Sequence, residues 1–282
     1  MAGPAGRRVR AGVLGSPVAH SLSPVLHRAA YAQLGLDWSY DAHDVPAGGL
    51  AGFLDALGPD WAGLSVTMPL KREALDLVDW ASPGARDVEA VNTVLLSRGR
   101  RLGSNTDVPG MLAALAEAGT TSAASGTVLG GGATARSALG ALRDLGVARA
   151  TVVARRPAAV QELAPTARRL GLGLVPAPWD PAALGDALGA DVVVAAVPGE
   201  AAAALAAAVP PRPGTLLDVA YDPWPTSLAA AWERAGGAVR GGLDLLVHQA
   251  VLQVGLMTGR DAPGRLLPVM RAAAEEALAA RA

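Results

Sequence analysis

Short apolar runs alternate along this chain with segments whose apolar residues recur every three to four positions. The run at residues 9–15 (VRAGVLG) ends at a glycine, and the segment from Ser23 to Gly35 then shows helical spacing. Repeated strand-then-helix units of this kind predict a parallel α/β architecture. Ser23 is the expected N-cap of the first helix, with Pro24 at its first position.

The same pattern predicts the remaining elements of the first part of the chain. They are strands at 38–45 and 62–67, helices at 50–57, 71–80 and 108–119, and a strand pair at 90–97 and 100–105 joined around Arg98 and Gly99. The second part begins with a strand, a glycine turn and a helix. Its elements are that unit at 126–146, strands at 148–156, 191–198 and 214–220, a helix at 159–171, a strand running into a long helix within 238–259, and a last helix at 266–280.

Composition narrows the class of protein. The 282 residues are 51% apolar and 17% charged with a net charge of −1, which suits a compact protein of roughly two domains. No basic face is expected, so nucleic acid is not an expected partner. No apolar run is long enough to span a membrane, and the first 15 residues lack the apolar core of a signal peptide, so we expect a cytoplasmic protein. The absence of cysteine and the unpaired spacing of the four histidines predict no metal site.

The glycine turn carries a nucleotide-binding pattern. VLGGGATAR places Gly130, Gly132 and Ala135 as G-x-G-x-x-A between a strand and a helix. Such glycines permit the tight turn and let the backbone approach a pyrophosphate, while the helix N-terminus favours the negative charge. A purely structural turn is the alternative.

The next strand indicates which nucleotide. NAD sites usually carry an acidic residue here, whereas this strand ends in Arg155 and Arg156. Two guanidinium groups suit the 2′-phosphate of NADP(H), with a solvated basic turn as the alternative.

Lys71 is the only lysine among the 24 basic residues. A guanidinium stays protonated, whereas an ammonium can give up its proton, so a lone lysine in an arginine-rich chain is a candidate for proton transfer. Chance alone would also explain a single lysine.

Five stretches together resemble shikimate dehydrogenase, in that family's order and over nearly the whole chain. They are GSPVAHSLSPVLH at 15–27, SVTMPLK at 65–71, AVNT at 90–93, NTD at 105–107 and GGLDLLVHQA at 241–250. The resemblance implies reduction of 3-dehydroshikimate to shikimate with NADPH, in the pathway to chorismate and the aromatic amino acids. It also implies a substrate-binding α/β domain at 1–108, completed by helices at 243–282, and a Rossmann-type NADP domain at 109–242.

The resemblance also implies roles for individual residues. Lys71 and Asp107 match the catalytic pair and touch the substrate. The other positions that match substrate contacts are Ser21 and Ser23 for the carboxylate, Thr67, Asn92 and Gln249 for ring hydroxyls, and Tyr221 beside the substrate. The positions that match cofactor contacts are Gly130, Gly131, Gly132, Ala133, Thr134, Arg155, Arg156, Val219 and Gly242. From the residues alone, Ser23 and Asp107 are equally good helix N-caps, and Tyr221 could be a half-buried aromatic.

Some positions depart from the family pattern. Ser65 stands where many members have asparagine, and the other departures lie at the cofactor: Ala133, Ala154, Ala195 and Val197. They bear on cofactor affinity and selectivity more than on substrate chemistry. An NAD-dependent quinate/shikimate dehydrogenase, an aminoshikimate-type dehydrogenase and a non-catalytic sensor of a shikimate-like acid remain alternatives, and the oligomer is expected to be a monomer or a homodimer.

Overall fold

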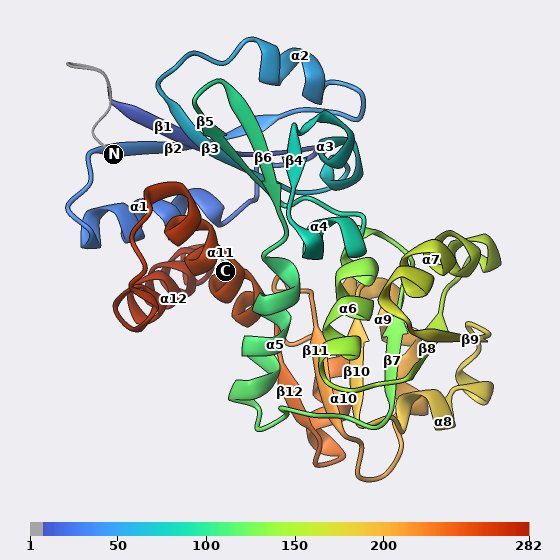
Figure 1. Ribbon diagram of the computed structural model, residues 1–282. Helices are drawn as coiled ribbons and strands as arrows, with labels where there is room; N and C mark the ends of the chain where they lie inside the picture. The colour runs from blue at the N-terminus through green and yellow to red at the C-terminus, as the bar shows by residue number, and fades with distance from the viewer. Residues whose placement is uncertain (1–7, 282) are drawn as a thin grey trace. The chain divides into compact units, whose positions relative to one another are not determined.

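The computed structural model describes residues 8–281, which form two compact units (Figure 1). Unit 1 contains the chain up to Thr106 and again from Leu246 onward, and unit 2 contains Asp107–Leu245. The domain limits expected from the sequence, after residues 108 and 242, stay predictions. The chain start, where no signal peptide is expected, lies mostly outside the described residues.

Unit 1 is built on a mixed sheet with strand order β2-β1-β3-β5-β6-β4. Its strands are β1 (Val9–Gly15), β2 (Trp38–Asp44), β3 (Trp61–Val66), β4 (Trp80–Ala81), β5 (Thr93–Ser97) and β6 (Arg100–Ser104). Its helices are α1 (Ser23–Gln33), α2 (Leu50–Asp55), α3 (Lys71–Leu77), α4 (Pro83–Asp87), α12 (Pro263–Ala279) and most of α11 (Gly242–Thr258). β1 lies parallel to β2 and β3, and β5 is antiparallel to both β3 and β6.

The C-terminal helices return to this first sheet, as predicted. On α11, Met257 packs so closely over β3 that a Cβ on Gly63 would lie 2.9 Å from its Cγ. α12 packs against α1. Arg260 donates a hydrogen bond of 2.7 Å to the carbonyl of Leu34, at the end of α1, where an arginine favourably meets unpaired helix carbonyls.

Unit 2 is built on a six-stranded, fully parallel sheet with order β12-β11-β10-β7-β8-β9. Its strands are β7 (Gly126–Leu129), β8 (Arg149–Val153), β9 (Gly173–Ala177), β10 (Val192–Ala195), β11 (Thr215–Asp218) and β12 (Ala238–Arg240). Its helices are α5 (Asp107–Glu117), α6 (Ala133–Asp144), α7 (Pro157–Leu170), α8 (Gly185–Leu188), α9 (Gly199–Ala203), α10 (Ser227–Arg234), the start of α11, and the 3₁₀ turns η1 (Pro181–Ala183) and η2 (Ala204–Ala208).

The second sheet has the strand order of a Rossmann fold, so the predicted fold class is confirmed. β7, β10 and β11 are buried throughout. Burial of every residue fits central strands covered on both faces, in contrast to the alternating burial of a one-sided sheet. The strand order reverses between β7 and β10, and ligands of such sheets bind at this switch point.

Three local predictions differ from the structure. Leu22, not Ser23, is the N-cap of α1, and it makes no side-chain cap hydrogen bond. α3 ends at Leu77 instead of residue 80, because Trp80 and Ala81 pair with β6 as a short strand. The edge strand β9 was not predicted, since Pro176 and Pro178 interrupt its short apolar run.

The predicted hairpin at Arg98 and Gly99 is confirmed. Both residues have positive φ, at 52° and 73°, which matches a two-residue turn between antiparallel β5 and β6.

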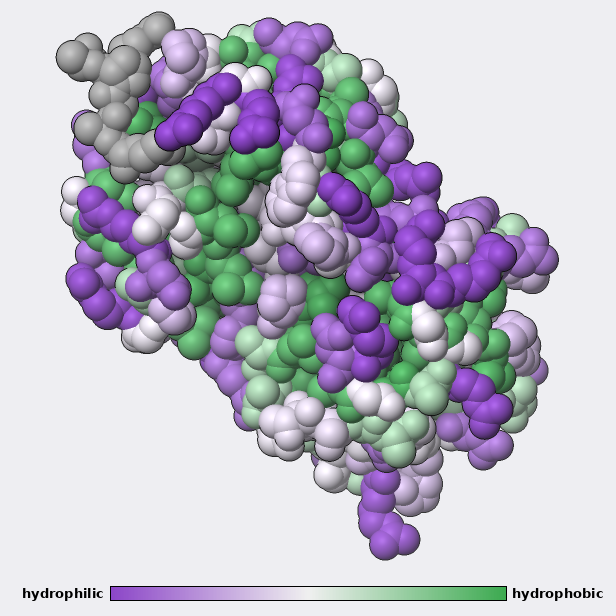
Figure 2. Space-filling view, viewed as in Figure 1, coloured by the Kyte–Doolittle hydropathy of each residue, from purple (hydrophilic) through white to green (hydrophobic). Residues whose placement is uncertain are grey.

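Hydrophilic residues are interspersed with hydrophobic ones over the face drawn in Figure 2. Among the helices of residues 8–281, none combines the length and the apolar character that crossing a membrane requires.

Candidate active site

The sheet of unit 1 brings three chain segments to one edge. Because β5 runs opposite to β3 and β6, the residues after β3, before β5 and after β6 meet there. Asn92, immediately before β5, is tied on both sides through its backbone: its carbonyl accepts from Val66 N at 2.7 Å and its N–H donates to Ser104 O at 3.0 Å. Thr67 follows β3 and is half-buried, and its N–H donates to Leu14 O at 2.8 Å. The backbone alone therefore fixes where Asn92 and Thr67 lie.

Asn92 and Gln249 form one buried polar cluster. The Asn92 amide nitrogen donates to Gln249 Oε1 at 3.3 Å and to Thr106 Oγ1 at 2.9 Å. Gln249, which α11 carries in from the far end of the chain, donates from its Nε2 to Leu246 O at 2.9 Å. Both amides are nearly inaccessible, with exposed fractions of 1% and 7%. Two of the residues expected to hold ring hydroxyls are thus placed together.

Ser21 and Ser23 stand at the start of α1. Ser21 Oγ accepts from the backbone N–H of Ser23 at 3.2 Å, so the serine that assists the helix start is Ser21. Ser23 itself is buried. Their role in binding a carboxylate stays a prediction.

Lys71 is the first residue of α3, as predicted, and only 9% of it is exposed. Its carbonyl accepts from Val91 N at 2.9 Å, which ties the helix start to the segment leading into Asn92. Asp107 is the first residue of α5, buried, and belongs to unit 2. The pairing of Lys71 with Asp107 therefore stays a prediction.

Tyr221 is half-buried and follows the end of β11 in unit 2. The loop that carries it is anchored by Asp218, whose carboxylate accepts from Ala220 N at 3.1 Å and from Thr226 Oγ1 at 2.6 Å. Burial raises the pKa of Asp218 above its ordinary value, partly offset by these two hydrogen bonds.

The three glycines after β7 serve different purposes. Gly130 has φ of +121°, and a Cβ there would lie 2.6 Å from the carbonyl oxygen of Ala196, which follows β10. A Cβ on Gly131 would lie 2.5 Å from the Cβ of Ala159. Gly132, the N-cap of α6, has φ of −87° and open space around a would-be Cβ. Folding therefore requires the first two glycines, whereas nothing in the described fold requires the third.

The substitution Gly132→Ala therefore distinguishes an effect on cofactor binding from an effect on folding. We expect the KM for NADP to rise about tenfold or more, because a methyl group would occupy the place where the backbone must approach a pyrophosphate. Stability should change by at most about 1 kcal/mol, since the backbone conformation suits alanine. Gly185→Ala, at another open glycine of unit 2 on α8, is the matched control for steady-state kinetics and thermal unfolding. An unchanged KM for NADP in Gly132→Ala would contradict the assignment.

The end of β8 presents two cationic side chains. Arg155 and Arg156 are both exposed, and Arg156 is the N-cap residue of α7. Arg156 lies 3.6 Å from Glu162 in an ion pair whose partners are 70% and 50% exposed. An ion pair this exposed contributes little, so a phosphate could compete for Arg156. In residues 8–281, no three His, Asp or Glu side chains are grouped so that they could hold a metal ion.

Comparison with known proteins decides the family. The description "Shikimate dehydrogenase substrate binding domain" matches residues 13–94, and "Shikimate 5'-dehydrogenase C-terminal domain" matches residues 242–275. A shikimate dehydrogenase (NADP(+)) from one strain of Thermus thermophilus is 40% identical over 256 residues, which is 89% of this chain and 93% of that protein. This chain belongs to the shikimate dehydrogenase family.

Solved structures of the family agree over almost the full length. The shikimate dehydrogenase of Mycobacterium tuberculosis is 42% identical with a TM-score of 0.84, and the match covers 96% of this chain and 99% of that one. The enzyme from a second strain of Thermus thermophilus, crystallised with NADP(H) and shikimate, is 35% identical with a TM-score of 0.79, and the match covers 94% of this chain and 99% of that one.

The structure shows which residues surround Ser65, Ala195 and Val197, three of the positions that depart from the family pattern. Ser65 is buried in β3 between Tyr40 and Gln253. Ala195 is fully buried in β10, and Val197 packs against the glycine turn, where its Cγ1 would lie 3.1 Å from a Cβ on Gly130. These two positions make an apolar wall where the family pattern has polar side chains.

Two predicted cofactor positions have a packing role of their own. A Cβ on Gly242 would lie 2.0 Å from the carbonyl oxygen of Val219, and Gly242 N donates to Ala220 O at 2.9 Å. Glycine is required here for the start of α11 to approach β11, whatever the cofactor does.

Sequence reasoning missed Gln253 and Thr106, which hold the predicted site residues in place. Gln253 lies on α11 one turn after Gln249, so the two share a face of a largely apolar helix. A second amide four residues beyond a predicted ligand is a signal that could have found it. Thr106 stands in the NTD stretch at 105–107, directly before Asp107, but only the fold places it beside Asn92.

Proposed function

We propose that this chain is an NADP-dependent shikimate dehydrogenase, which interconverts 3-dehydroshikimate and shikimate. The observation that carries the proposal is the buried cluster of Asn92 and Gln249 at the sheet edge of unit 1, in a chain whose relatives carry this activity. Two amides side by side offer the donors and acceptors that neighbouring ring hydroxyls require.

In this proposal Asn92, Gln249 and Thr67 orient the ring through its hydroxyls, and Ser21 and Ser23 take its carboxylate. Lys71 holds the proton that reaches the substrate oxygen during reduction, and Asp107 orients the ammonium. Tyr221 lies beside the substrate. Proton transfer by a positioned side chain typically contributes about 10²–10⁴-fold to the rate.

The cofactor proposal rests on unit 2. The switch point between β7 and β10, the open space at Gly132 and the exposed arginines after β8 together fit a dinucleotide with a 2′-phosphate. When bound, NADPH supplies the hydride. Gly130 to Thr134 would hold the pyrophosphate, and Arg155 and Arg156 would hold the 2′-phosphate. Val219 and Gly242 would also contact the cofactor.

The experiment follows nicotinamide absorbance with shikimate, with quinate and with an aminoshikimate substrate, each with NADP and with NAD, and measures shikimate binding by calorimetry. Turnover with shikimate and NADP is expected. Activity only with quinate and NAD would make the chain a quinate dehydrogenase, preference for an aminoshikimate substrate would place it in a secondary pathway, and binding without turnover would make it a sensor.

A cytoplasmic location and a monomeric or homodimeric state complete the proposal. Sedimentation of the purified full chain at several concentrations measures the second of these directly.

A further inference from the structure

A continuous chain of hydrogen bonds between buried side chains crosses unit 1. Tyr40 OH donates to Ser65 Oγ at 2.6 Å, and Ser65 Oγ donates to Gln253 Oε1 at 2.7 Å. Gln253 Nε2 in turn donates to the backbone carbonyl of Asn92 and to Thr93 Oγ1, both at 3.0 Å. Four strand and helix elements contribute to this chain, and all its members are buried.

The backbone oxygen of Asn92 determines which group donates and which accepts in each of these bonds. A backbone carbonyl can only accept, so the Asn92 oxygen requires the NH₂ side of the Gln253 amide to face it. Gln253 Oε1 must then face Ser65, which has a single hydrogen and gives it to that oxygen. Ser65 is left as an acceptor for Tyr40.

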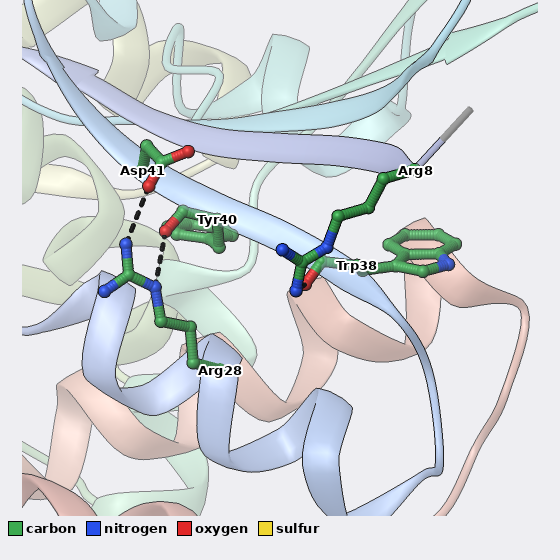
Figure 3. A network of polar contacts seen from close by, with 5 residues as sticks. All are labelled: Arg8, Arg28, Trp38, Tyr40 and Asp41. Atoms are coloured by element: carbon green, nitrogen blue, oxygen red, sulfur yellow. Dashed lines mark hydrogen bonds and ion pairs between the residues drawn. The ribbon is translucent and has the colours of Figure 1, made fainter.

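One branch ends on Tyr40. Burial raises the pKa of Tyr40, partly offset by its hydrogen bond with Ser65, so the phenol keeps its hydrogen and gives it to Ser65. The backbone of Tyr40 is held as well: Arg28 on α1 donates to Tyr40 O at 2.9 Å and to Asp41 at 2.7 Å (Figure 3).

The other branch ends on the Asn92 side chain. Thr93 Oγ1 accepts from Gln253, so its own hydrogen goes to Asn92 Oδ1 at 2.9 Å. The backbone N–H of Thr106 donates to the same oxygen at 2.8 Å. With its oxygen held by these donors, Asn92 must turn its NH₂ group toward Gln249.

His27 fits the same order. Its Nε2 lies 3.4 Å from Gln253 Oε1 and its ring stacks on Tyr40 at 4.0 Å. Burial lowers the pKa of His27 to about 3, partly opposed by the hydrogen bond with Gln253, so the ring is neutral at pH 7. A neutral ring with its hydrogen on Nε2 adds a second donor to Gln253 Oε1.

We infer that Gln253 is a positioning residue for substrate binding, which sets the hydrogen-bond direction along the buried chain that ends at the Asn92 side chain. The inference rests on the proposed function, since it takes Asn92 as a substrate ligand. Gln253 itself acts on Asn92 through Thr93.

Gln253→Met tests this, because it keeps a side chain of similar length and removes both the donor and the acceptor. The KM for shikimate is expected to rise about tenfold, which corresponds to the free energy of roughly one hydrogen bond. The KM for NADP should stay within about twofold of the parent value. The fall in kcat should be smaller than the rise in the KM for shikimate. Thr93→Val keeps shape while cutting the link between Gln253 and Asn92 Oδ1, and should change the same constant in the same direction.

Thr258→Val is the matched control. Thr258 is buried on the same helix as Gln253, but its hydroxyl donates to Val254 O at 2.7 Å and lies outside the chain from Tyr40 to Asn92. Its kinetic constants should stay within about twofold of the parent protein.

The possible outcomes separate the two proposals. If the parent protein does not turn over shikimate, the proposed function fails. If it does, and a folded Gln253→Met or Thr93→Val variant keeps the parent KM for shikimate, the positioning role is wrong. An equal rise in the KM values for shikimate and NADP would also overturn the role, because it would report general damage.

Discussion

Replacing Lys71 by methionine is expected to lower kcat for shikimate oxidation by about 10²–10⁴-fold, with a much smaller change in KM. Lys71 is the first residue of α3 and almost fully buried, and its carbonyl is tied to the segment that leads into Asn92. Methionine has a similar length and keeps the packing, so the fall in kcat should come from the loss of proton transfer by the Lys71 side chain.

Lys71→Arg is the sharper form of this experiment. It keeps the positive charge but places a guanidinium, which does not release its proton, where proton transfer is expected. The kcat should fall nearly as far as in the methionine variant. Arg72→Met is the neighbouring control, because the Arg72 side chain is 57% exposed and forms an ion pair with Glu89 at 3.5 Å. A near-normal kcat in Lys71→Arg would move the proton-transfer role to another residue.

Removing both guanidinium groups after β8 is expected to abolish most of the preference for NADP over NAD. A hydrogen bond to a charged group contributes about 1.5–3 kcal/mol, so Arg155→Ala with Arg156→Ala should reduce the ratio of kcat/KM values about 10²–10⁴-fold. The loss should come from weaker NADP binding, with kcat/KM for NAD nearly unchanged. Steady-state kinetics with each cofactor at fixed shikimate measures it.

Arg168→Ala provides the charge control for that double variant. Arg168 is exposed in the last turn of the same helix, α7, and donates to Ala164 O at 3.4 Å. The Arg168→Ala substitution removes a positive charge from α7 and leaves the residues at the end of β8 unchanged. If the double variant retained the parent ratio, the arginines would be a solvated turn and the selectivity would lie elsewhere.

Local pattern predicted the order of most elements because the longer strands and helices each have a characteristic spacing of apolar residues. The Arg98–Gly99 hairpin and the strand–turn–helix at Gly130 were predicted from a few adjacent residues. The N-cap of α1 was wrong for a physical reason: two serines stand two residues apart at the start of this helix, and the one whose hydroxyl accepts from a backbone N–H there is Ser21. Spacing along the chain does not distinguish these two serines.

The sequence by itself determined the α/β class, the glycine turn with its following arginines and the family, because these are written in short contiguous motifs. The tertiary structure alone decided that Gln253, from the far end of the chain, meets Asn92, and that Gly132 is the one glycine of its turn that folding leaves open. Hydrogen-bond direction and free space depend on atoms that are distant in sequence, so no local pattern records them.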